Sequence, residues 1–113
     1  MRPELQAAFA AELRLASEHD GRGDHAGAWH HLERAHVLSQ AHAGPHVWAH
    51  VRMLTHAWRQ RNRREIAGQL VRILVAAPGT WLGRAPLGNT GGANVGLLTP
   101  MPLPEDLRAV LGK

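Results

Sequence analysis

Nine histidines give this chain its most unusual chemistry, and all of them lie between His19 and His56. His46 and His50 are four residues apart, so their imidazoles share one face of any helix that contains both. That spacing allows the two rings to bind a single ion, because neutral imidazole is a common ligand of zinc, copper and nickel. The spacing therefore predicts a metal site on this helix.

The helix before it offers further donors in His31, Glu33 and His36. His36 lies one residue off the predicted buried stripe, a position that suits the groove between two packed helices. If the two helices are neighbours, His36 approaches His46 and His50, and His31 or Glu33 completes the coordination together with water. The expected cofactor is a divalent transition metal, namely zinc, copper or nickel.

Incidental histidines on an interaction module are the main alternative to a metal protein. A single helical histidine usually hydrogen-bonds to a neighbour or faces solvent, and the chain has no compact ligand motif such as HExxH. We expect His19 and His25, which flank the first turn, to be exposed. An enzyme with His36 or a metal-bound water as its base is a third hypothesis. No Ser-His-Asp arrangement or carboxylate pair stands out, so the sequence neither indicates nor excludes an enzyme.

The stretch GNTGGANV, residues 88–95, is a second candidate site. Its Gly and Asn residues permit positive φ, and their amides can form a concave anion nest. It matches neither a P-loop nor a dinucleotide fingerprint, because it follows no predicted strand and opens no helix. We favour tight turns in a packed tail over an anion site. The residues concerned are Arg84, Asn89, Thr90, Gly91, Gly92 and Asn94.

Four helices are expected before residue 78, and they must position these side chains. The first runs from about Pro3 to Asp20-Gly21, and the second follows a cap at Asp24. The third covers about residues 45–60 and the fourth about residues 63–77, where Pro78-Gly79 ends it. The predicted apolar faces are Leu5, Ala8, Phe9, Leu13 and Ala16; Ala28, Leu32, Ala35 and Leu38; Val47, Val51, Leu54 and Trp58; and Ile66, Leu70, Ile73 and Leu74.

The second pair of helices repeats the first with an offset of 38 residues, so that Leu32 maps onto Leu70. Such units resemble the tetratricopeptide helix-turn-helix. Two units are fewer than these arrays normally need, so the tail or a partner chain must cover an open face, and we expect a homodimer. The predicted fold is all-α: one domain, residues 1–113, with a four-helix core over 1–78.

Residues 79–113 form the predicted tail. Its first part, residues 79–104, holds six Gly and four Pro, so no helix or strand of useful length fits. Several apolar residues in it argue against disorder, and we expect an ordered tail wrapped over the bundle. A short helix from Pro104 to Leu111, with Glu105 and Asp106 in its first turn, is expected to end the chain.

Composition limits the other possibilities. The chain has 113 residues, 44% of them hydrophobic and 19% charged, which is enough for one folded core. Cysteine is absent, which excludes disulfides, iron–sulfur clusters and thiol nucleophiles. No apolar run reaches the roughly 18–20 residues of a membrane helix. Glu4 and Glu12 interrupt any signal-peptide pattern, so we expect a cytoplasmic protein that does not bind membranes.

The net charge is +4, and four arginines cluster at Arg59, Arg61, Arg63 and Arg64. Such a cluster can attract an acidic or peptide partner, but a solvated helix end is the simpler interpretation. Only Trp58 lies among these arginines, so the interleaving typical of nucleic-acid binding is missing and we do not expect it.

Four segments of the chain carry a resemblance: HLERAHVLSQ (31–40), PHVWAHVRML (45–54), HAW (56–58) and, most specifically, LGNTGGANVGLLTPMPLP (87–104). Through them, nearly the whole chain resembles a small family of uncharacterised bacterial proteins. It implies no assigned activity and a loose association with heavy-metal resistance determinants. Ser39 departs from the pattern, where Gly is expected. The histidines and acid on motif positions are His31, Glu33, His36, His46, His50 and His56.

Overall fold

Five α-helices make up the computed structural model, which describes residues 1–81, 89–93, 95 and 100–113. They are α1 (Pro3–Gly21), α2 (His25–Ser39), α3 (Ala43–Arg59), α4 (Arg63–Trp81) and α5 (Glu105–Leu111). No strand occurs in this part of the chain, so the predicted all-α fold with a short last helix is confirmed. None of the described helices combines the length and apolar character needed to cross a lipid bilayer.

The turns between the helices follow from local chemistry. The Asp24 side chain caps α2 by accepting a hydrogen bond from the Gly27 N–H at 3.0 Å. Gly23 before it has a φ of +77°, which glycine adopts without strain. α3 begins at Ala43, two residues before the predicted start at Pro45. A proline fits there because the N–H groups of a first helical turn have no partner within the helix.

α4 continues through Pro78-Gly79, where the sequence predicts its end, and its backbone stays helical to Trp81. That prediction is wrong. Proline in a helix loses one N–H donor and crowds the carbonyl four residues before it, but its fixed φ is compatible with a helix, so the last turn continues past it. Few hydrogen bonds remain to be lost this close to the end of the helix. The tail therefore begins after residue 81.

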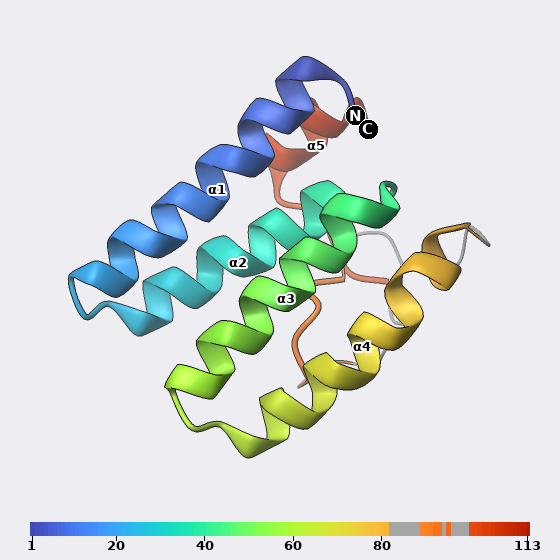
Figure 1. The fold of residues 1–113 in the computed structure, drawn as a ribbon. Helices are drawn as coiled ribbons and strands as arrows, with labels where there is room; N and C mark the ends of the chain where they lie inside the picture. The colour runs from blue at the N-terminus through green and yellow to red at the C-terminus, as the bar shows by residue number, and fades with distance from the viewer. Residues whose placement is uncertain (82–88, 94, 96–99) are drawn as a thin grey trace.

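α1 to α4 lie side by side in chain order, each packed on the one before it (Figure 1). α5 packs against both α1 and α2, at the end of the bundle that also holds the N-terminus. Residues 89–93 of the tail return to the bundle, where they bond to His36 of α2 and Gln69 of α4. Two helical hairpins are thus joined by a segment that reaches both.

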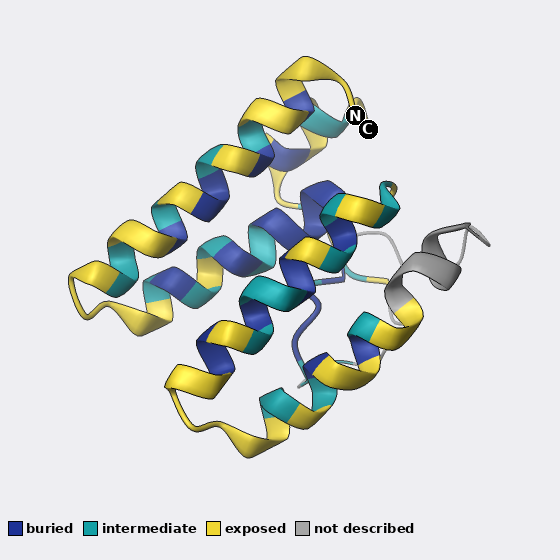
Figure 2. Ribbon diagram, in the orientation of Figure 1, coloured by how far each residue is buried: buried dark blue, intermediate teal, exposed yellow. Residues whose placement is uncertain are grey.

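Buried residues recur along α1 and α2 (Figure 2), and the apolar ones among them follow the predicted stripes. Ala49 and Met53 of α3 pack into this core beside α1 and α2. At the other end of the hairpin, Leu107 of α5 packs with Leu5 and Leu38. Burial of this apolar surface is the main stabilising contribution here. The predicted residues that are buried are Leu5, Phe9, Leu13, Ala16, Ala28, Leu32, Ala35 and Leu38.

The α3–α4 hairpin turns other faces inward than predicted. Trp58 of α3 is 70% exposed, and Leu74 of α4 is 78% exposed. Gln69 and Arg72 of α4 are buried instead. The prediction is therefore wrong for Trp58, Leu70 and Leu74, whereas the other predicted residues are partly buried, namely Val47, Val51, Leu54, Ile66 and Ile73. The polar groups turned inward are tolerated because they bond to each other and to the tail. The buried residues of α3 are His46, Ala49, His50, Met53, His56 and Ala57.

Candidate metal centre

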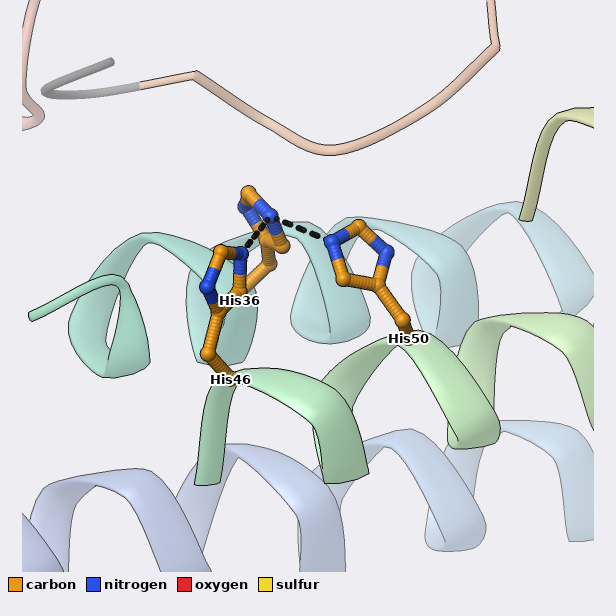
Figure 3. Close-up of side chains that lie close together, drawn as sticks. All are labelled: His36, His46 and His50. Atoms are coloured by element: carbon orange, nitrogen blue, oxygen red, sulfur yellow. Dashed lines mark hydrogen bonds between the residues drawn. The ribbon is translucent and has the colours of Figure 1, made fainter. Parts of the chain in front are cut away.

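Three histidine rings converge between α2 and α3 (Figure 3). His36 lies near the C-terminal end of α2, and His46 and His50 lie on successive turns of α3. His36 Nε2 is 3.0 Å from His50 Nε2 and 3.1 Å from His46 Nε2. One nitrogen from each ring lies within 4.8 Å of the others, and all three residues are buried. We call these three residues the histidine triad.

Hydrogen bonds fix the tautomers of two triad rings. His36 Nδ1 lies 2.7 Å from the Asn89 carbonyl oxygen, and a carbonyl can only accept, so Nδ1 carries the hydrogen. His50 Nδ1 donates in the same way to Gln69 Oε1 at 2.6 Å. A neutral imidazole has only one N–H. The Nε2 atoms of His36 and His50 therefore face each other as two lone pairs.

The orientation of the Gln69 amide is fixed by its other contacts. Its Nε2 donates to the Gly91 carbonyl at 2.8 Å and to Glu65 Oε2 at 3.0 Å, two groups that accept. The amide oxygen must therefore face His50. Glu65 Oε1 accepts from the backbone N–H of Ala93 at 2.6 Å. A continuous chain of bonds thus joins the triad, α4 and the tail.

Protonation of the triad is unfavourable. Burial lowers the pKa of His46 from 6.5 to about 4, and the neighbouring His50 adds to the shift. Burial likewise lowers the pKa of His50 to about 4, with a smaller contribution from Arg72. Burial and the two neighbouring rings lower the pKa of His36 well below its ordinary value. The triad is therefore neutral at pH 7, and a proton does not relieve the repulsion between its lone pairs.

The triad fits a transition-metal ion. Zinc binds imidazole nitrogen at about 2.0–2.1 Å, which places two tetrahedral ligands roughly 3.3 Å apart. Distances of 3.0 and 3.1 Å between the facing nitrogens need only a small opening to reach that value. Ligating histidines typically donate their second N–H to an oxygen acceptor, as His36 and His50 do here. Calcium and magnesium do not fit, since they prefer oxygen ligands.

The tail covers the triad through Gly91. Gly91 has a φ of +86°, and a Cβ on it would lie 2.7 Å from Cγ of the His36 ring. Both its conformation and the close approach of the backbone therefore require glycine. The Gly91 N–H donates to Asn89 Oδ1 at 2.8 Å, which closes a tight turn. The backbone at this turn shields the His36 ring from solvent.

His31 and Glu33, the other predicted ligands, are not among the converging donors. His31 donates from Nδ1 to Glu12 Oε2 of α1 at 2.7 Å. It precedes His36 by five residues, about 140° around the helix, so it faces α1 instead of the triad. Glu33 is partly buried beside Thr90, and burial raises the pKa of its carboxyl group. Among the described residues, the triad alone forms a group of converging donors.

Four histidines outside the triad, His31 among them, bond to carboxylates. His19 donates to Asp24 at 2.7 Å, and His25 donates to Asp20 at 2.9 Å. His56 donates to the second oxygen of Asp20 at 3.2 Å. The His25 side chain is 49% exposed, but the His19 side chain is only 23% exposed, less than we expected. These pairs join the ends of α1, α2 and α3 away from the triad.

The described residues of the GNTGGANV stretch hydrogen-bond to each other and to side chains in and around the triad. The N–H groups of Gly91 and Ala93 donate to side-chain oxygens of Asn89 and Glu65, so they are already used. This arrangement favours tight turns over an anion nest at these positions. Arg84 and Asn94, the other residues predicted for an anion site, lie outside the described residues.

Glu65, Gln69 and Arg72 are the supporting residues that the sequence reasoning missed. Arg72 donates to the carbonyls of Gly68 and Val95, at 3.1 and 2.9 Å. The three residues are spaced four and three apart, so they share one helix face. The sequence does show this polar stripe, but the same helix also carries an apolar stripe. The polar stripe was the one signal that could have indicated these residues.

Comparison with known proteins gives one match. The family model described as "Protein of unknown function (DUF3703)" matches residues 3–111. The chain belongs to this family. Membership of an uncharacterised family is thereby confirmed, and the DUF3703 match spans all five described helices. No curated protein and no solved structure matches the chain significantly, so the tetratricopeptide resemblance stays a prediction.

Proposed function

We propose that this DUF3703 protein binds one divalent transition-metal ion through the histidine triad. The observation that carries the proposal is the pair of Nε2 lone pairs that His36 and His50 turn toward each other at 3.0 Å. Two lone pairs at this separation repel each other, and the repulsion is strong in a buried site, where the effective dielectric constant is lower than in water. A metal ion between the rings converts that repulsion into coordination.

Zinc, copper and nickel are the proposed ions. The three ligands are imidazoles, with neither the thiolates that favour soft ions nor the carboxylates that favour calcium or magnesium. Copper is expected to bind most tightly in vitro, because the affinity of nitrogen sites for divalent first-row metals rises along the series to copper.

Burial favours holding the ion over turning over a substrate. Three histidine ligands leave one position of the ion to water, as in catalytic zinc sites, but catalysis also needs access for a substrate, and the triad is buried under the turn at Gly91. We therefore propose a role in buffering, delivering or sensing the metal. Release of the ion then requires the turn to move away from His36.

Calorimetric titration of zinc, copper and nickel into the protein, prepared without a histidine tag, tests the proposal. We expect one ion per chain, and loss of most of the affinity in His50→Ala. His25→Ala is the matched control, because His25 bonds to Asp20 away from the triad, and it should bind like the wild type. Bound metal should also stabilise the fold, by about 2.7 kcal/mol at a hundredfold excess over the Kd.

Two outcomes contradict the proposal: no binding by the wild type, or equal binding by His50→Ala and His25→Ala. In either case the interaction module becomes the better hypothesis. Circular dichroism of each variant shows whether a loss of affinity reflects a loss of fold.

A further inference from the structure

Exposed residues recur along α4 (Figure 2), and four of them have large apolar side chains. Leu70 and Val71 are 50% and 52% exposed, and Leu74 and Val75, four residues further on, are 78% and 39% exposed. This spacing places all four on one face of the helix. We call these four residues the α4 stripe. They are the majority of the large hydrophobic residues exposed in the described part of the chain.

The α4 stripe carries no charge. Arg72 is the only charged residue between 66 and 81, and it is buried with its guanidinium bonded to the carbonyls of Gly68 and Val95. Contiguous apolar patches on a protein surface mark interaction sites. A strongly acidic or basic partner would find no complementary charge on this stripe, so the matching surface must itself be apolar.

The first and last helices of the row, α1 and α4, differ in the helices that pack on them. The first helix of the row, α1, packs on both α2 and α5. Among the described helices, α4 packs on α3 alone. The terminal units of stacked helical arrays need a polar or covered outer face. The α4 end has neither among the described residues.

We propose that the α4 stripe is a homodimer interface, in which α4 pairs antiparallel with α4 of a second copy. A second copy supplies the same uncharged stripe at the same spacing, as a twofold interface requires. Parallel pairing would bring Arg63 and Arg64 against the same residues of the partner. Antiparallel pairing separates them and turns each pair toward the negative end of the other helix dipole.

The dimer does not depend on the metal. Gln69 and Arg72 face the interior with the triad, whereas the α4 stripe faces outward. A failed metal titration therefore leaves this proposal standing, and a monomeric protein leaves the metal proposal standing.

Sedimentation velocity over about 1–300 µM protein tests the interface. We expect the wild type to dimerise within this range and Leu74→Glu to remain monomeric, with helicity and metal affinity unchanged. Trp58→Glu is the matched control, because Trp58 is an exposed hydrophobic residue of α3 outside the stripe, and it should dimerise like the wild type. A monomeric wild type at the highest concentration, or a dimer of undiminished affinity in Leu74→Glu, overturns the proposal.

Cysteine cross-linking tests the orientation, since the chain has no cysteine of its own. Val71→Cys lies near the middle of the stripe, so a short bis-maleimide should join two copies. Arg64→Cys lies at one end of α4, and antiparallel pairing keeps the two thiols apart. Cross-linking through Arg64→Cys in place of Val71→Cys overturns the antiparallel arrangement.

Discussion

The two helical hairpins bury opposite kinds of surface. Between α1 and α2 the interior is mostly aliphatic and aromatic, built from residues such as Leu13 and Leu38. Between α3 and α4 the interior includes His50, Gln69 and Arg72, and the leucines and valines of α4 lie outside. One hairpin therefore supplies an apolar core, whereas the other supplies a polar interior whose groups must all find partners.

This difference assigns different tasks to the hairpins. Apolar burial is non-directional and accounts for most of the stability that a small domain can reach. A buried network gives less net stability but fixes the positions of its members, which a metal site requires. The tail serves the second task, because its Asn89 and Gly91 carbonyls accept from His36 and Gln69.

The largest effect is expected from cutting the apolar core. Leu38→Ala removes a fully buried side chain, so the free energy of unfolding should fall by about 2–5 kcal/mol. The matched control is Leu74→Ala, which removes the same atoms from an exposed position. At a concentration where the chain is monomeric, the control should stay within about 0.5 kcal/mol of the wild type. Urea unfolding measures both, and similar losses would remove the distinction between the hairpins.

Acid should destabilise the metal-free protein through its polar interior. The pKa of His46 and that of His50 are lowered to about 4, so between pH 6.5 and 4 the unfolded chain binds more protons than the folded chain. Stability should therefore fall as the pH drops through that window, by roughly 3 kcal/mol for one ring. Thermal unfolding at a series of pH values measures this, and His46→Gln should flatten the dependence. An equally steep dependence in that variant would show that the acid sensitivity arises elsewhere.

Closing the tail over the triad depends on Gly91. Gly91→Ala meets the His36 ring and also takes an unfavourable φ, whereas Gly23→Ala takes a similar φ with nothing within 4 Å. Backbone strain should lower the free energy of unfolding of both variants by about 1–3 kcal/mol. Only Gly91→Ala should add a clash and weaken metal binding. Thermal unfolding and metal titration of the pair separate the two effects. Equal behaviour of the two variants would mean that the tail does not press on the triad.

The smallest effect is expected at a surface charge pair. Arg34 of α2 bonds to buried Glu12 of α1 and to exposed Asp106 of α5. Asp106→Asn should cost at most about 1 kcal/mol, because exposed ion pairs contribute little and Glu12 still neutralises Arg34. Glu105→Gln beside it, which forms no ion pair with any described residue, should cost less. A loss comparable to that of Leu38→Ala would mean that charge, and not Leu107, holds α5 in place.

Helix positions were largely predictable, because capping residues, turn glycines and apolar periodicity are local signals. The inward face of α4 was not. Its sequence carries an apolar stripe through Leu70 and Leu74 and a polar stripe through Gln69 and Arg72, and periodicity alone does not say which is buried. The decision depends on partners that come from far along the chain, including the backbone at Gly91.

The spacing of residues in the sequence was enough to predict the triad, but not the residues that support it. The four-residue interval of His46 and His50, together with hairpin packing, brought the triad together in the prediction. Excluding His31 required the actual rotation of α2, since Glu12 on α1 binds that ring. Gln69 and Glu65 are significant only because of what they contact, so no local motif could reveal them.

Long-range ¹H–¹⁵N NMR of the imidazole rings, during titration with zinc, tests the central claim most directly. All nine histidines are observed together, and the tautomer of each ring is read from its nitrogen shifts. Before zinc is added, His36 and His50 should carry their hydrogens on Nδ1. One equivalent of zinc should then shift the Nε2 signals of His36, His46 and His50 and leave those of the other six rings nearly unchanged. Shifts that begin at the carboxylate-bound rings, or a triad that does not respond, would contradict the account.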